Sequence, residues 1–336
     1  DPAEAAALAL ADNKIGELAD WDDEGLRAVL LELDAEDVNL DGLGFSDEEL
    51  NSFLDIVEPD FAEDSELDLE VNDTVIHSRI GEVYDLGDHR LACGDSTDPS
   101  VWKLVLQDES AEMIWTDPPY GVSYVGKTAD ALTIQNDELC NDDLGAFLGK
   151  VFDAALAHSI PGCAVYVAAP AGPKGIPFAV ELHQRDMFRQ RLVWVKQTLV
   201  LGHSDYHYKH EDIYFGYTPG YEGRRGRGSV GWYSDNSQTS VLQFDRPTAS
   251  REHPTMKPLD LISYCIQNSS MRDAVVFDPF GGSGSTMMAA AMTGRRARLI
   301  ELDPRYCDVI RRRWTRYARA NNIDPGPGAL DPLDGE

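Results

Sequence analysis

The sequence lacks several features that would assign it to a large class of proteins. No apolar run approaches the roughly 18 to 20 residues of a membrane-spanning helix, and the N-terminus has no basic segment followed by an apolar one, as a signal peptide would. No C-x-x-C pair occurs among the five cysteines, which are Cys93, Cys140, Cys163, Cys265 and Cys307. These absences predict a globular cytoplasmic protein with buried free thiols and no metal site.

Charge is distributed unevenly along the chain. The net charge is -30 over 336 residues. Residues 1–80 hold 25 acidic and three basic residues, a net charge of -22, so the rest of the chain carries only -8. The total charge therefore does not exclude a polyanionic partner, because the body of the protein can carry local basic faces.

The sequence pattern divides the chain into four parts. Residues 1–57 are acidic with apolar residues at helical spacing, and Ser46 with Glu49 forms a capping box. Residues 58–73 lose this periodicity, which predicts an acidic linker. Between 74 and 320 short apolar segments alternate with helical ones, which predicts an α/β domain with a mostly parallel sheet flanked by helices. Residues 321–336 are expected to form a flexible tail.

The α/β domain is expected to contain strands of β-branched and aromatic residues bounded by Gly, Asp and Pro. The expected strands are 82–86, 89–95, 111–117, 163–169, 189–196, 211–217, 273–278 and 295–303. The expected helices are 142–159, 258–269 and 283–293. The basic segment 311–320 is expected to form a further helix on the surface.

One expected strand runs directly into Asp117-Pro118-Pro119-Tyr120. Consecutive prolines cannot continue a sheet ladder, because each lacks an N–H group and has a fixed φ. Taken alone, the four residues fit either a stiff surface turn or a site that holds a flat, polar ligand in one pose.

A second motif has the pattern of a nucleotide site. The strand ending at Asp278 is followed by the glycine-rich turn 280–284 and then by a helix, and Glu301 ends the next strand. Glycines let a ligand approach the backbone, and an acidic residue about 20 positions later suits ribose hydroxyls. The third glycine of the dinucleotide pattern is replaced by Met287, and no P-loop Gly-Lys-Ser/Thr follows. A tight structural turn is the alternative.

Four motifs in this order resemble those of the S-adenosylmethionine-dependent amino DNA methyltransferases. They are CGDST at 93–97, DPPY at 117–120, HPTMKP at 253–258 and DPFGGSGS at 278–285. Because DPPY precedes the glycine loop, the order resembles that of the β group, and the resemblance covers roughly residues 81–318. It implies a Rossmann-like fold, S-adenosylmethionine as cofactor, double-stranded DNA as substrate and a bacterial or phage origin.

The resemblance also implies roles for individual residues. Asp117 and the carbonyl of Pro118 would accept hydrogen bonds from the target amine, Pro119 would keep them rigid, and Tyr120 would stack on a flipped base. The cofactor would contact Asp95 through its adenine, Glu301 through its ribose, and Thr255 and Lys257 through its carboxylate. The methionine and sugar side would be lined by Asp278, Phe280, Gly281, Gly282 and Gly284.

Residues 198–250 occupy the place of the family's target-recognition region. Histidines, aromatic residues and arginines among glycines suit contacts to phosphates or guanine edges. The expected DNA contacts are His203, His207, Lys209, Arg224, Arg225 and Arg227. A solvated loop is the alternative for each arginine.

Several functional alternatives stay open. Asp117 favours adenine-N6 methylation, whereas cytosine-N4 enzymes use the same chemistry and more often carry serine there. The -22 head also suits a non-catalytic DNA-binding or DNA-mimicking regulator. Ring-carbon methylation would need a nucleophilic cysteine after proline, and the sequence has no Pro-Cys. The head resembles the helical tail of ParB-like nuclease domains without their nuclease motifs. No membrane partner is expected, and a homodimer and a restriction or phage partner stay open.

Overall fold

The computed structural model describes residues 75–120, 141–196, 205–244 and 257–331. The predicted acidic head at 1–57 and linker at 58–73 lie outside these ranges, as do His203 and Thr255. The boundary predicted at 74 and the roles of these segments stay predictions.

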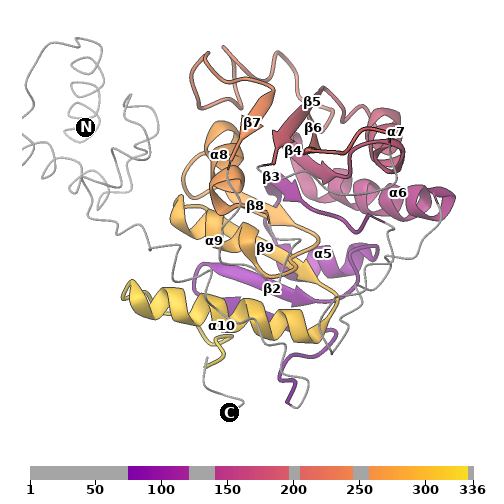
Figure 1. The fold of residues 1–336 in the computed structure, drawn as a ribbon. Coiled ribbons are helices and arrows are strands. Elements are labelled where there is room, and N and C mark those ends of the chain that lie inside the picture. The colour runs from indigo at the N-terminus through magenta and orange to yellow at the C-terminus, as the bar shows by residue number, and fades with distance from the viewer. Residues whose placement is uncertain (1–74, 121–140, 197–204, 245–256, 332–336) are drawn as a thin grey trace, which may run out of the picture. The chain divides into compact units, whose positions relative to one another are not determined.

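A nine-stranded sheet forms the centre of the described body, in the order β1-β2-β9-β8-β3-β4-β6-β5-β7 (Figure 1). The five strands from β2 to β4 run parallel, and β1 and β6 run antiparallel to their neighbours. The strands are β1 Val83–Leu86, β2 His89–Cys93, β3 Ala111–Thr116, β4 Ser159–Ala169, β5 Gln190–Val195, β6 His210–Tyr217, β7 Val241–Gln243, β8 Val275–Asp278 and β9 Arg296–Glu301. The predicted mostly parallel sheet is confirmed.

Helices cover both faces of this sheet, as Figure 1 shows. One face carries α5 Pro99–Leu106, α6 Asn141–His158 and α7 Ile176–Gln184. The other carries α8 Leu259–Ser269, α9 Ser285–Met292 and α10 Pro304–Ala320. Parallel strands joined by crossover helices require this three-layer arrangement, because the sheet is apolar on both faces.

The helix boundaries follow local sequence. Asp98 and Asp303 cap α5 and α10 by accepting hydrogen bonds from the backbone N–H groups of Ser100 at 2.8 Å and Arg305 at 2.9 Å, and a proline begins each helix. The predicted helices at 142–159, 258–269 and 283–293 are observed within two residues of their predicted ends. The short helices α5 and α7 and the three-residue strand β7 were not predicted.

Large aromatic residues fill both core layers. Trp102 of α5 stacks on Phe277 of β8 with ring centroids 4.2 Å apart. On the opposite face Trp314 of α10 is 1% exposed and packs edge-on against His89, 4.5 Å away. These contacts attach helices from both ends of the described chain to the same sheet.

Helix α10 is more deeply packed than the predicted surface helix. The side chains of Arg311 and Arg313 are buried, and the Arg311 guanidinium lies 4.1 Å from the ring of Tyr84. Arg311 also donates to the carbonyl of Gly328 at 2.7 Å. The basic residues of this helix therefore pack the protein interior as well as its surface.

The flexible tail predicted from residue 321 does not describe the segment up to Asp331. The indole of Trp314 donates to the carbonyl of Pro325 at 2.9 Å, and the backbone N–H of Leu330 donates to Thr315 Oγ1 at 3.1 Å. Leu330 is 6% exposed. The backbone N–H of Gly328 also donates to the carbonyl of Asp85 at 2.7 Å, and local sequence does not encode these contacts.

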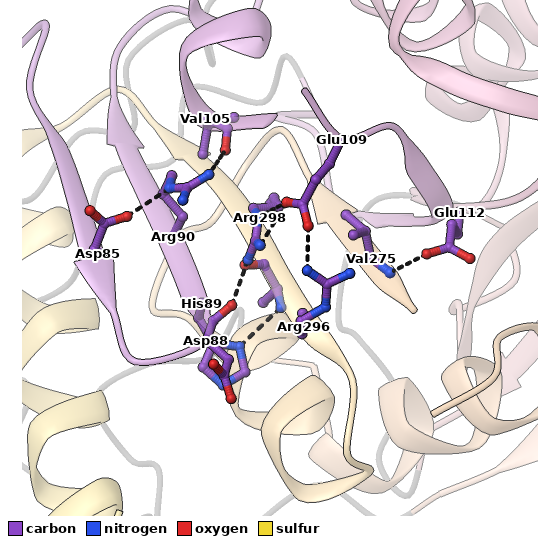
Figure 2. A network of polar contacts seen from close by, with 11 residues as sticks. Asp85, Asp88, His89, Arg90, Val105, Glu109, Glu112, Val275, Arg296 and Arg298 are labelled. Carbon is purple, nitrogen blue, oxygen red and sulfur yellow. Dashed lines mark hydrogen bonds and ion pairs between the residues drawn. The ribbon is translucent and has the colours of Figure 1, made fainter. Parts of the chain in front are cut away.

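A polar network fastens β2 and β9 at the amino-terminal edge of the parallel strands (Figure 2). Glu109 pairs with Arg296 and, at 2.7 Å, with Arg298. His89 Nδ1 accepts the backbone N–H of Ala297 at 2.9 Å. Burial and both arginines lower the pKa of His89 to about 3, which keeps its ring neutral and able to accept this bond.

The four cysteines in the described residues are buried free thiols, as predicted. Burial raises the pKa of Cys163 and of Cys265. Among the described residues, no helix is long and apolar enough to cross a membrane.

Candidate active site

The sequence-predicted motifs converge at the carboxyl edge of the parallel strands. Asp95 follows β2, Asp117 follows β3, Asp278 ends β8 and Glu301 ends β9. The chain continues from β3 to α6 on one face and from β8 to α9 on the other, so the connections that follow these two paired strands go to opposite faces of the sheet. Ligand crevices of open α/β sheets form at such a switch point, outside the carboxyl ends of the strands.

The Asp117 carboxylate is held by two donors, one on each oxygen. The hydroxyl of Tyr120 donates to Oδ1 at 2.7 Å, and the ammonium of Lys257 donates to Oδ2 at 2.6 Å. Lys257 also donates to the Tyr120 hydroxyl at 3.0 Å. These contacts place the Lys257 ammonium on the Asp117 motif. Its expected position beside the cofactor carboxylate stays a prediction.

Two residues that were not predicted complete this cluster. Glu211 is the second residue of β6, and its Oε2 lies 3.1 Å from the Lys257 ammonium and 3.4 Å from the Tyr120 hydroxyl. Lys196 follows β5 and forms an ion pair with Glu211 Oε1. Because β6 runs antiparallel to β4, its first residues reach the same edge as the last residues of β3 and β5. Only the sheet topology brings these residues to Asp117.

The cluster is electrostatically coupled. Burial alone would raise the pKa of Glu211, but the ammonium groups of Lys257 and Lys196 outweigh it and lower the pKa to about 2. Burial alone would lower the pKa of Lys257, but Asp117 and Glu211 outweigh it and raise the pKa. Both groups are therefore charged at neutral pH.

The ring of Tyr120 is fixed by packing as well as by its hydroxyl. It meets Phe178 of α7 edge-on, with centroids 6.0 Å apart, and the Lys257 ammonium lies 5.3 Å from its centroid. Burial and the nearby carboxylates of Asp117 and Glu211 raise the pKa of Tyr120. The phenol therefore keeps its proton and can donate a hydrogen bond to Asp117.

The glycine loop is organised by the carboxyl group that precedes it. Asp278 accepts hydrogen bonds from the backbone N–H of Phe280 at 3.0 Å and from the hydroxyl of Thr286. Gly282 and Gly284 have φ of 52° and 88°, where a side chain would be strained. A Cβ added at Gly282 would approach no atom closer than 4.0 Å, so this part of the loop faces open space.

Glu301 fastens the same loop to β9. One carboxylate oxygen accepts the backbone N–H of Gly282 at 2.8 Å, and the other accepts that of Asp303 at 2.9 Å. Burial raises the pKa of Glu301 and of Asp278 to about 7 each. The glycine loop is therefore bordered by two carboxyl groups that ionise near neutral pH.

The remaining predicted cofactor residue, Asp95, is exposed at the same edge. Its Oδ1 accepts the backbone N–H and the hydroxyl of Thr97, both at 2.8 Å. Both hydrogen bonds from Thr97 go to Oδ1 and none to Oδ2. The contact of Asp95 with the cofactor adenine stays a prediction. In the described ranges no group of three or more His, Cys, Asp or Glu side chains is arranged to hold a metal ion.

The predicted DNA contacts fall into two separate places. His207 and Lys209 are exposed just before β6, at the edge that carries Asp117. Arg225 instead donates to the carbonyl of Pro161, near the start of β4, and lies 3.9 Å from the ring centroid of Tyr221.

Pro161 lies eight positions before Ala169, the end of β4, which corresponds to about 26 Å at a rise of ~3.3 Å per residue. Arg225 is therefore held at the amino-terminal end of the parallel strands, opposite the end that carries Asp117. Its neighbours Arg224 and Arg227 are exposed beside it. Contact of all these residues with DNA stays a prediction.

Comparisons with known proteins agree with this geometry. The model of the DNA methylase family of N6/N4 type matches residues 111–312, which is more than half of the chain. The chain is 38% identical over 63 residues to Type II methyltransferase M2.MboI of Moraxella bovis, covering 19% of this chain and 23% of that protein. It is 35% identical over 83 residues to Type II methyltransferase M.HinfI of Haemophilus influenzae, covering 25% and 21%. The matched segments thus span about a quarter of these relatives.

Solved structures show a similar fold. The PvuII DNA methyltransferase, described as cytosine-N4-specific, has a TM-score of 0.52 at 17% identity and covers 75% of this chain and 99% of that one. TTHA0409 of Thermus thermophilus has a TM-score of 0.50 at 22% identity and covers 68% and 95%. At these identities the likeness concerns the fold alone.

Proposed function

Since this chain belongs to the N6/N4 DNA methylase family, we propose that it transfers a methyl group from S-adenosylmethionine to the N6 amine of an adenine flipped out of double-stranded DNA. The observation that carries the proposal is the position of Asp117. Its carboxylate is held on both oxygens at the switch point, next to a glycine loop bordered by acidic groups.

The residues beside the glycine loop fit the cofactor. S-adenosylmethionine is the methyl donor of this family and supplies an electrophilic methyl group on a cationic sulfonium when bound. Asp278 and Glu301 would offset this positive charge, and the open space at Gly282 would let the ligand approach the backbone. Each carboxylate oxygen of Glu301 accepts one observed hydrogen bond and has a second lone pair for a ribose hydroxyl.

Asp117 would activate the amine by accepting one of its hydrogen bonds. The lone pair of an exocyclic amine is delocalised into the ring, and acceptors for both N–H groups direct it out of the ring plane. Asp117 Oδ1 and Oδ2 each keep a lone pair beyond those used by Tyr120 and Lys257. The carbonyl of Pro118 would accept the second N–H, and the two prolines fix its direction.

Base flipping supplies access to the amine, which is otherwise enclosed in the duplex. The ring of Tyr120 is held by Phe178 and by its hydroxyl contacts, so it would offer a fixed surface for the extruded base. His207 and Lys209 are exposed at the same edge and would contact the DNA there.

Cytosine-N4 methylation is the second candidate. It is favoured by the fold likeness to the cytosine-N4-specific PvuII enzyme, and the same acceptors would activate either amine. Incubation of mixed-sequence duplex DNA with cofactor labelled in its methyl group, followed by digestion to nucleosides, separates the two. We expect the label in N6-methyldeoxyadenosine; label in N4-methyldeoxycytidine would replace the proposal by the second candidate, and no transfer would refute both.

A further inference from the structure

Glu211 and Lys196 are charged, buried and absent from the family motifs in this sequence. Glu211 Oε2 approaches Lys257, and its Oε1 is bound by Lys196. The side chains of Lys196, Glu211 and Lys257 are only 7%, 14% and 6% exposed. Burying three charged groups is costly unless each serves as partner to another.

The contacts of Lys257 explain what Glu211 does. An ammonium group has three hydrogens, and Lys257 has three oxygen partners: Asp117 at 2.6 Å, Tyr120 at 3.0 Å and Glu211 at 3.1 Å. Its orientation is therefore fully determined. Of these three partners, Glu211 is the one that does not belong to the DPPY motif, and its Oε2 also lies 3.4 Å from the Tyr120 hydroxyl.

On this geometry we propose that Glu211 is a positioning residue for methyl transfer, acting through Lys257 to hold Asp117 and Tyr120 in place and to balance their charge. The inference rests on the proposed function. Asp117, Lys257, Glu211 and Lys196 together carry no net charge, whereas loss of Glu211 leaves a net positive cluster. The amine nitrogen gains positive charge as the methyl group arrives, so an uncompensated cation there opposes the reaction.

The test compares Glu211→Gln with a matched control at the other edge of the sheet. Glu109→Gln is the control because Glu109 also pairs with two basic residues, Arg296 and Arg298 (Figure 2), and precedes β3, whereas the DPPY motif follows it. We expect Glu211→Gln to lower kcat by about 10- to 100-fold, the range of a slightly misplaced catalytic group. The Kd for S-adenosylmethionine should change by less than about twofold, because Glu211 contacts Lys257 and the Tyr120 hydroxyl and not the glycine loop. Glu109→Gln should leave kcat unchanged.

The pH dependence separates positioning from a merely structural role. The titratable groups facing Lys257 are Asp117, Tyr120 and Glu211, with Lys196 beyond Glu211. Removing the Glu211 charge lowers the Lys257 pKa, so kcat of Glu211→Gln should decline at a lower alkaline pH than kcat of the wild type. Lys196→Gln removes a neighbouring cation instead, so its kcat should show no such decline. Glu211→Asp should recover part of the rate.

The inference fails if Glu211→Gln keeps the wild-type kcat and pH profile, or if Glu109→Gln lowers kcat equally. Should Glu211→Gln not fold, Glu211→Asp and Lys196→Gln decide. Equal alkaline declines of kcat in these two variants would overturn the inference. Full activity of Glu211→Asp without an alkaline decline of kcat would also overturn it. Wild-type protein is assayed alongside for labelled methyl transfer to DNA. Absence of transfer by wild type contradicts the proposed function, whereas wild-type transfer with an unaffected Glu211→Gln contradicts only the role of Glu211.

Discussion

Substitution of Asp278 by Asn should change how the stability of the protein depends on pH. Burial raises the pKa of this carboxyl group from 3.8 to about 7, although Thr286 and the N–H of Phe280 hydrogen-bond to it. The folded state therefore keeps a proton that the unfolded state releases between about pH 4 and pH 7. The stabilisation from this group is complete below about pH 4 and is lost as pH rises to about 7.

The magnitude follows from the two pKa values. Each pH unit within this window lowers the free energy of unfolding by about 1.4 kcal/mol per proton. The free energy of unfolding should therefore fall by about 2 to 3 kcal/mol between pH 5 and 7 through Asp278 alone. Glu301 adds a loss of the same sign, because its pKa is also raised to about 7. Asparagine is uncharged at all these pH values, so Asp278→Asn should remove the Asp278 share and keep that of Glu301.

Urea unfolding of the cofactor-free protein at pH 5 and pH 7.5 measures this difference. Asp235→Asn is the matched control, because Asp235 is exposed and hydrogen bonds from Ser237 lower its pKa, so it is ionised at both pH values. We expect the pH 5 to 7.5 loss of stability to be smaller by about 2 kcal/mol in Asp278→Asn and unchanged in Asp235→Asn. An equal loss in wild type and Asp278→Asn would show that Asp278 is already ionised at pH 5.

Three further outcomes are expected. Glu301→Ala should raise the Kd for S-adenosylmethionine and leave DNA binding unchanged, because it removes the acceptor for Gly282 N–H and the carboxylate proposed to bind the ribose. Unchanged cofactor affinity by calorimetry would place the ribose contact elsewhere. Tyr120→Ala should weaken DNA methylation by about 1 to 3 kcal/mol through lost stacking, and Tyr120→Phe by less; equal losses in steady-state kinetics would assign the effect to the hydroxyl. Deletion of residues 1–70 should leave folding, activity and the salt dependence of DNA binding unchanged, whereas tighter non-specific binding at low salt would place the acidic head near the DNA.

Much of the fold could be predicted because its signals are local. The strands of the parallel sheet are short runs of β-branched and aromatic residues, and the three that end at Thr116, Asp278 and Glu301 lead directly into or end on a functional residue of the same motif. Helix α9 follows directly from the glycine turn. Helices α5 and α7 were missed because eight or nine residues give too little helical periodicity to recognise.

The missing part of the site depends on contacts between distant residues. Glu211 is 94 positions from Asp117, and its charge is meaningful only because β6 runs antiparallel beside β4. Arg225 was predicted as a DNA contact because it lies among glycines; its guanidinium donates to the carbonyl of Pro161, near the start of β4, and its contact with DNA stays a prediction. Charge and composition could not place Glu211 near Asp117 or Arg225 beside Pro161, because both placements depend on the strand order.

The proposed role of Asp117 in methyl transfer, at the edge shared with the glycine loop, is tested most directly by Asp117→Ala. Single-turnover transfer of labelled methyl groups to duplex DNA is measured together with calorimetric binding of S-adenosylmethionine. We expect transfer to be abolished while the cofactor Kd stays nearly the same, because Asp117 contacts Tyr120 and Lys257 and not the glycine loop. Transfer at a rate close to that of the wild type would contradict the proposal.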